Sequence, residues 1–89
     1  MKIKEGFKLR TLLGEHIVTR EGYDQVNFNK MISLNESAAY LWEAVAGRDF
    51  DVAELASLLV KEYGIEQELA LHDAQAIADK WVEIGLVEG

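Results

Sequence analysis

Apolar residues in the first third of the chain are spaced as in short strands. Over residues 7–20 apolar and polar positions alternate roughly, with a break at Gly14-Glu15. A glycine-centred break between two extended runs is typical of a β-hairpin. A second turn signal at residues 21–24 precedes a weaker strand pattern that ends at Leu34. The pattern therefore predicts three short strands, the last at about residues 30–34.

From Asn35 onward, apolar residues recur with the period of a helix. Asn35 suits an N-cap because its side-chain oxygen can accept a hydrogen bond from the first turn. The helix that follows is predicted to end near Gly47. Asp51 and Glu54 have the spacing of a capping box, which predicts a second helix closed by Gly64.

A third helix is predicted from about residue 69 to residue 84, with Gly85 as its C-cap and residues 86–87 returning to the core. Its apolar face includes Trp81, which is therefore expected in the core. Beside that face, Asp73, Ala76 and Lys80 follow the spacing i, i+3 and i+7 and form a separate stripe. Asp73 in this stripe suits either the positive end of the helix dipole or a cationic ligand.

Strands followed by helices, without alternation, favour an α+β fold rather than a parallel sheet. We expect an N-terminal three-stranded antiparallel sheet followed by three helices. Three helices with short turns and a neighbouring hairpin also match a winged helix-turn-helix. With 89 residues, one domain spanning 1–89 is expected.

Composition limits the chemistry. The chain has no cysteine, which excludes disulfides, thiolate metal sites and cysteine nucleophiles. His16 and His72 are far apart in the sequence and lack a third metal ligand at a suitable spacing. Ser33, Ser37 and Ser57 have no neighbouring histidine to act as a base. We therefore expect no catalytic residue, no metal and no cofactor. A signal peptide and a membrane-spanning run are both absent from the sequence, which predicts a cytoplasmic protein.

The formal net charge of −7 is unevenly distributed. Residues 1–34 carry six Lys or Arg against four acids, whereas residues 35–89 carry three against twelve. The acidic helical part would repel nucleic acid, whose binding depends on phosphate neutralisation. This part is interpreted either as a solvated acidic face or as a surface for a basic partner.

An ordered set of residues resembles a known family. The segment Leu34-Asn35-Glu36-Ser37-Ala38-Ala39 is similar to the L-N-x-T/S-A helix start of the PqqD family, the small proteins of pyrroloquinoline quinone synthesis and their relatives. The resemblance covers about residues 7–88. The other matching positions are Trp42, Gly47, residues 50–56, Leu59, Tyr63, Asp73 and Gly85-Leu86-Val87.

The resemblance implies a winged helix-turn-helix that acts as a non-catalytic recognition element for ribosomally made precursor peptides. Such a module captures the leader segment and presents the peptide to a modifying enzyme, often a radical SAM protein. The leader adds as a strand beside the third strand and lies against the last helix. On this chain the implied peptide-binding residues are Lys30, Met31, Ile32, Ser33, Leu34, Asp73, Ala76 and Lys80.

Several points stay open at the level of sequence. Alternation places either Ile32 and Leu34 or Met31 and Ser33 on the core side of the third strand. The alternative functions are a winged-helix regulatory or DNA-binding protein and an adaptor that binds a protein through its acidic face. Nucleic acid and membrane are not expected partners of the favoured module, and an exposed edge strand also permits a homodimer.

Overall fold

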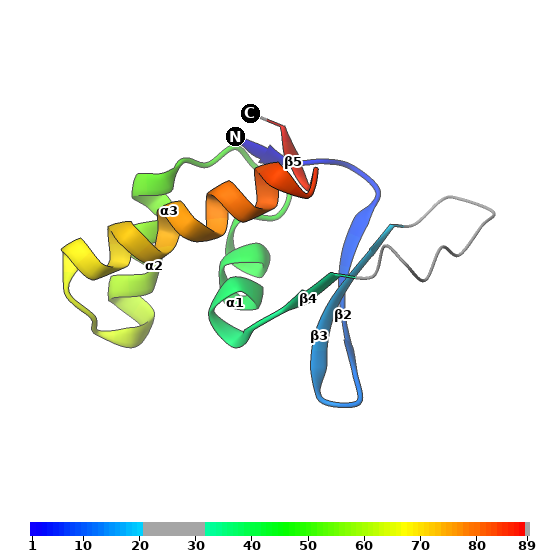
Figure 1. Cartoon of the computed structure of the whole chain (residues 1–89), viewed down its shortest axis with the longest axis horizontal. Helices are drawn as coiled ribbons and strands as arrows, with labels where there is room; N and C mark the ends of the chain where they lie inside the picture. The colour runs from blue at the N-terminus through cyan, green and yellow to red at the C-terminus, as the bar shows by residue number, and fades with distance from the viewer. Residues whose placement is uncertain (21–31, 89) are drawn as a thin grey trace.

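In the computed structural model, residues 1–20 and 32–88 are described. Strands β2 (Phe7–Leu12) and β3 (Glu15–Arg20) form the predicted hairpin, and β4 (Ile32–Leu34) pairs antiparallel with β3. The strand order in this sheet is β2-β3-β4. Three helices follow in sequence and lie to one side of the sheet (Figure 1). The predicted α+β class, with a three-stranded antiparallel sheet before three helices, is confirmed.

The hairpin turn differs by one residue from the expectation. The loop is Leu13-Gly14, and Glu15 is already the first residue of β3. Leucine is not a turn-forming residue, so the pattern pointed to Gly14 and the polar residue after it. The predicted third strand also began at Lys30. Lys30 and Met31 lie outside the described residues.

A second, two-stranded sheet was not predicted. Strand β1 (Lys2–Ile3) pairs antiparallel with β5 (Val87–Glu88), and the Lys4 N–H donates to the Leu86 carbonyl over 2.9 Å. Strands of two residues are too short to show an alternating pattern, and this pair joins opposite ends of the sequence. The predicted return of residues 86–87 to the core is confirmed, since both are buried.

The helices begin and end largely where their capping signals indicate. Asn35 caps α1 (Glu36–Val45), and its side chain accepts a hydrogen bond of 2.8 Å from the Ala38 N–H. Asp51 caps α2 (Val52–Tyr63) in the same way, and the left-handed Gly64 ends it. Helix α3 (Gln67–Glu83) begins two residues before the predicted start. Its N-cap Glu66 makes no side-chain capping bond, so the sequence held no clear start signal.

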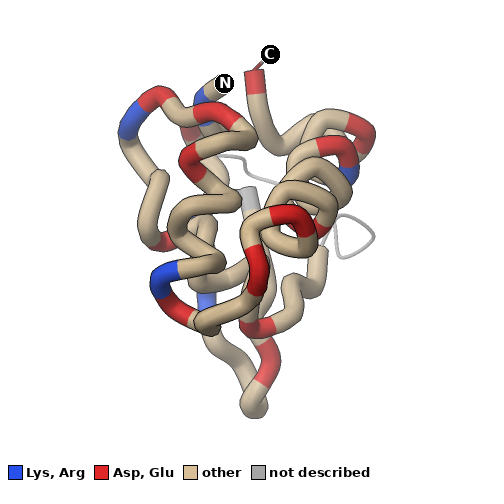
Figure 2. Tube along the Cα trace, turned by 90° about the vertical axis from the view of Figure 1, so that its left-hand side faces the viewer, with Lys and Arg blue, Asp and Glu red and all other residues tan. Residues whose placement is uncertain are grey.

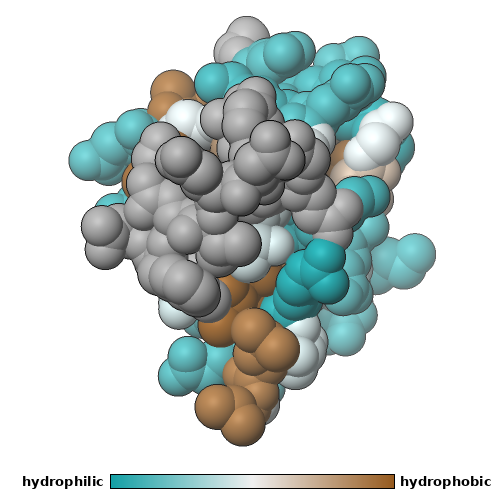
Figure 3. Space-filling view, turned by 90° about the vertical axis from the view of Figure 1, so that its right-hand side faces the viewer, coloured by the Kyte–Doolittle hydropathy of each residue, from teal (hydrophilic) through white to brown (hydrophobic). Residues whose placement is uncertain are grey.

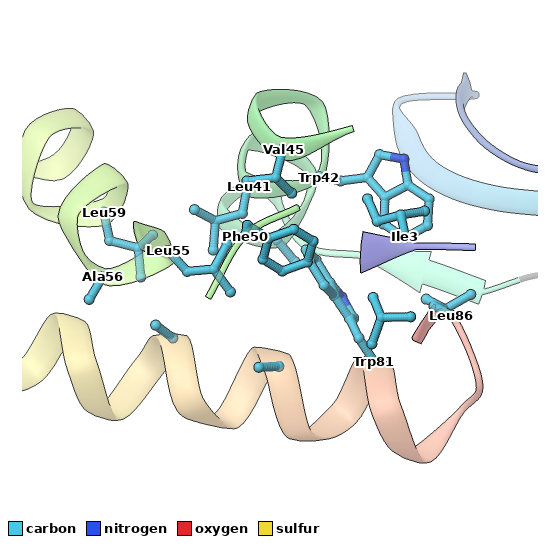
Figure 4. Packing of buried hydrophobic residues seen from close by; sticks show 14 of the residues in the cluster. Ile3, Leu41, Trp42, Val45, Phe50, Leu55, Ala56, Leu59, Trp81 and Leu86 are labelled. Carbon is cyan, nitrogen blue, oxygen red and sulfur yellow. The ribbon is translucent and has the colours of Figure 1, made fainter. Parts of the chain in front are cut away.

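The core lies mainly among the three helices, with single buried residues added by β1, β3 and β5, and Trp81 of α3 is part of it (Figure 4). The Trp81 ring makes edge-to-face contacts with Trp42 and Phe50, at centroid separations of 5.5 and 6.1 Å. Its exposed fraction is 1%, which confirms the predicted core position. The buried alanines of α3, residues 70, 74 and 78, allow α3 to pack closely on its neighbours.

Candidate functional site

Strand β4 is at the edge of its sheet, because within the described residues it pairs only with β3. The side chains of Ile32 and Leu34 are partly buried and pack against the core. Ser33, between them, is exposed. Of the two orientations allowed by the sequence, the structure therefore has Ile32 and Leu34 facing inward.

The hairpin loop determines which backbone groups of β3 point toward β4. Leu13 and Gly14 form a two-residue loop with φ of +52° and +80°, closed by the pair Leu12 and Glu15. In such a hairpin the closing pair exchanges both of its backbone hydrogen bonds. Alternation along β3 then directs the backbone groups of residues 15, 17 and 19 toward β2. Those of residues 16 and 18 point toward β4.

The same alternation identifies the free backbone groups of β4. Ile32 is opposite Val18 and Leu34 is opposite His16, so the N–H and C=O of both residues face β3. Ser33 is opposite Ile17, whose backbone groups point the other way. The N–H and C=O of Ser33 are therefore directed at the open edge of the sheet. An extended segment placed there would find one donor and one acceptor at Ser33.

A cavity of about 450 Å³ begins where β4 ends. Its volume is in the range of pockets that bind small ligands. The start of α1, the end of α2 with the loop after it, and the middle of α3 all contribute to it. The lining residues are Asn35, Ser37, Leu59, Tyr63, Ile65, Asp73, Ala76 and Ile77.

The cavity combines apolar walls with a carboxylate. Leu59 is buried, and Ile65 and Ile77 are partly buried against the core. Tyr63 is 46% exposed, and its ring packs edge-to-face on Tyr40. Asp73 is exposed and has no ion-pair or hydrogen-bond partner among residues 1–20 and 32–88. The cavity therefore suits an apolar side chain with a cationic group nearby.

The structure brings together only some of the residues that the sequence had singled out. Asp73 and Ala76 share the wall of the cavity, and Lys80 is exposed one helical turn further along α3. Ser33 is on the neighbouring strand edge, whereas Lys30 and Met31 are outside the described residues. The sequence pattern did not indicate Tyr63 or Ile65 as lining residues. Their roles depend on how the end of α2 packs against α3.

Acidic residues predominate at the helical end of the molecule (Figure 2). Helix α3 alone carries four acids against Lys80. Among the described residues, no group of three or more His, Cys, Asp or Glu side chains could hold a metal ion. None of the helices that the structure describes is long and apolar enough to cross a membrane. The chemical features of this region are thus a strand edge, an apolar cavity and negative charge.

Comparison with known proteins identifies the family. The family model for Coenzyme PQQ synthesis protein D (PqqD) matches residues 15–87. The chain belongs to the PqqD family. PqqD proteins are precursor-peptide-binding partners of radical SAM enzymes. The match includes β3, β4 and all three helices, and it confirms the resemblance seen in the sequence.

Neither a curated protein nor a solved structure matches this PqqD-family chain. The winged helix-turn-helix arrangement therefore stays a prediction from the resemblance.

Proposed function

We propose that this PqqD-family protein binds the leader segment of a precursor peptide by strand addition to β4. It presents that peptide to a modifying enzyme of the radical SAM type and catalyses no step itself. The observation that carries the proposal is the open edge at Ser33 beside an apolar cavity. Strand addition uses backbone hydrogen bonds for affinity and side-chain pockets for selectivity, and this region has both.

The register of β4 specifies how the leader would lie. A leader residue opposite Ser33 would exchange hydrogen bonds with its N–H and C=O, and its side chain would point outward with that of Ser33. Leader residues opposite Ile32 and Leu34 would point inward, toward the helices. The cavity begins just past Leu34. An inward-pointing leader residue at this end of β4 is therefore the one that would enter it.

The cavity lining indicates what that leader residue is. Burial of one large aliphatic or aromatic side chain contributes about 1.5–3 kcal/mol. A partly exposed ion pair between Asp73 and a leader Lys or Arg contributes at most about 1 kcal/mol. The apolar side chain of the leader therefore contributes most of the binding free energy at the cavity, and a leader Lys or Arg near Asp73 adds selectivity. Ala76, with its small side chain, leaves room for the leader backbone, and Lys80 continues the same stripe of α3.

The charge of α3 argues against the DNA-binding alternative. A helix that enters the major groove needs cationic side chains near the phosphates. Helix α3 instead has four acids and one lysine. In the adaptor alternative a protein binds the acidic face and leaves β4 free. The following experiment separates this alternative from strand addition.

The test is an NMR titration of the isotope-labelled protein with the leader half of its cognate precursor peptide. We expect amide shifts at Ser33 and around Ala76 and Ile77. Shifts confined to the acidic surface of α2, with β4 unchanged, would instead support the adaptor alternative and contradict strand addition.

A pair of matched variants tests the cavity directly. Ala76→Phe places a large side chain in the cavity from an exposed position, and we expect leader affinity to fall at least about tenfold, because the anchor residue is obstructed. Ala53→Phe is the control, since Ala53 is an exposed alanine of α2 that lines a different cavity. Equal leader affinity for both variants would show that the Ala76 cavity is not the binding site.

A further inference from the structure

The tip of the β2–β3 hairpin exposes two adjacent leucines. Leu12 is 47% exposed and Leu13 is 105% exposed. The hairpin extends away from the helices, and its end is a hydrophobic knob at the bottom of the molecule in Figure 3. Ile17, on the same outer face of the sheet as Leu12, is partly buried. Within the described residues, the β2–β3 hairpin thus ends in exposed apolar side chains.

Neither burial nor local conformation accounts for a leucine at position 13. Its φ of +52° is in the left-handed region, which Gly, Asn and Asp adopt more readily than residues with larger side chains. In a two-residue hairpin loop, Asn-Gly is the favoured pair, whereas this chain has Leu-Gly. The leucine is therefore unfavourable for the turn and gains no packing in the folded chain. Such a position is explained when the side chain is buried by a partner.

The surroundings of the tip indicate the chemistry of that partner. Lys8 and Arg10 are exposed on the same outer face as Leu12, and Arg10 Nε donates to the Thr19 hydroxyl over 3.3 Å. Glu15, the one acid within β2 and β3, is opposite Leu12, and the two cations are further along β2 from the turn. A convex apolar tip with Lys8 and Arg10 behind it fits a concave apolar pocket whose outer rim carries carboxylates. A membrane is a poorer fit, because two leucine side chains bury less apolar surface than a single acyl chain, which by itself gives only marginal membrane binding.

We infer that the hairpin tip is a second docking element, which inserts Leu12 and Leu13 into an apolar, carboxylate-rimmed pocket of the peptide-modifying enzyme. The inference rests on the proposed function for the identity of that partner. The two contacts do not compete for the same groups. The last pair between β3 and β4 is His16 with Leu34, and the tip lies beyond it. An enzyme bound at the tip would thus be next to the leader without covering the Ser33 edge.

The test is Leu13→Asn, measured with the purified radical SAM enzyme that modifies the same precursor peptide. Because Asn-Gly suits this turn, we expect an unchanged or higher melting temperature. We expect affinity for the enzyme to fall about tenfold or more, as for the loss of one buried leucine side chain. Leu12→Thr, which keeps a strand-forming residue, should weaken enzyme binding in the same direction.

The matched control is Leu69→Gln, since Leu69 is 51% exposed on α3 and glutamine is a good helix former. It should leave enzyme affinity unchanged. Unchanged affinity for Leu13→Asn, or equal losses for Leu13→Asn and Leu69→Gln, would overturn the inference. Binding to phosphatidylcholine–phosphatidylglycerol vesicles that is lost in Leu13→Asn, with enzyme affinity intact, would indicate a membrane contact and also overturn it.

Leader affinity, measured by fluorescence anisotropy with each variant, separates the two proposals. We expect Leu13→Asn to bind the leader with the same affinity as the unsubstituted protein. If Leu13→Asn lost leader binding and kept enzyme binding, the tip would belong to the peptide site and the inference would be wrong. If the unchanged chain bound no leader, the proposed function would fail, whereas a Leu13-dependent enzyme contact would still establish the docking element.

Discussion

Proline at two successive positions of β4 should impair different properties: leader binding at position 33 and stability at position 32. Ser33→Pro removes an N–H that points to the open edge, so it breaks no hydrogen bond within the sheet. Proline is tolerated in edge strands at such positions. Ile32→Pro removes an N–H that faces β3 and is directed at the carbonyl of Val18, a residue with 0% exposure. The two substitutions are at neighbouring positions, yet only Ile32→Pro should damage the fold.

The magnitudes follow from these hydrogen bonds. Ile32→Pro loses one hydrogen bond and leaves a buried carbonyl unsatisfied, which costs about 1–3 kcal/mol. A loss of about 1–3 kcal/mol lowers the melting temperature of a domain of this size by roughly 4–24 °C. Ser33→Pro should reduce the free energy of unfolding by less than about 1 kcal/mol. It should weaken leader binding by about 1–2 kcal/mol, or about 5–30-fold.

Thermal unfolding followed by circular dichroism, and leader titration by fluorescence anisotropy, measure both quantities. Ile32→Ala is the control for the lost side chain, because it keeps the N–H. If Ser33→Pro proved less stable than Ile32→Pro, the register derived from the hairpin loop would be wrong. If Ser33→Pro were stable and bound the leader with unchanged affinity, the leader would not add at this edge.

Two further predictions concern a cap and a charge. Asn35→Ala removes the acceptor for the Ala38 N–H, so the free energy of unfolding should fall by about 1 kcal/mol and the melting temperature by roughly 4–8 °C. An unchanged melting temperature would mean that α1 gains nothing from its cap. Asp73→Asn should weaken binding of a Lys- or Arg-bearing leader by up to about fivefold at low salt. That difference should disappear at high salt because surface charges are screened, and a loss that persisted at high salt would contradict the ion-pair account.

The elements of this chain whose signals are local could be predicted from the sequence. Asn35 and Asp51 cap helices because a side-chain oxygen and a nearby N–H suffice, and Gly64 ends one because it readily adopts the left-handed conformation. The apolar period of the last helix placed Trp81 in the core. The ordered residues around these elements also led to the family, which the match over residues 15–87 confirms.

Only the tertiary structure decided what depends on contacts between distant residues. The alternation in β4 allows two orientations, and the structure has the one in which Ile32 and Leu34 face inward and the Ser33 backbone groups point to the open edge. The cavity exists because the end of α2 and the middle of α3 meet beside Asn35. The sequence pattern placed the hairpin turn at Gly14-Glu15, whereas in the structure the loop is Leu13-Gly14, which exposes Leu13. Local chemistry therefore determined the elements of this protein, whereas pairing and packing over long sequence separations determined its candidate binding surfaces.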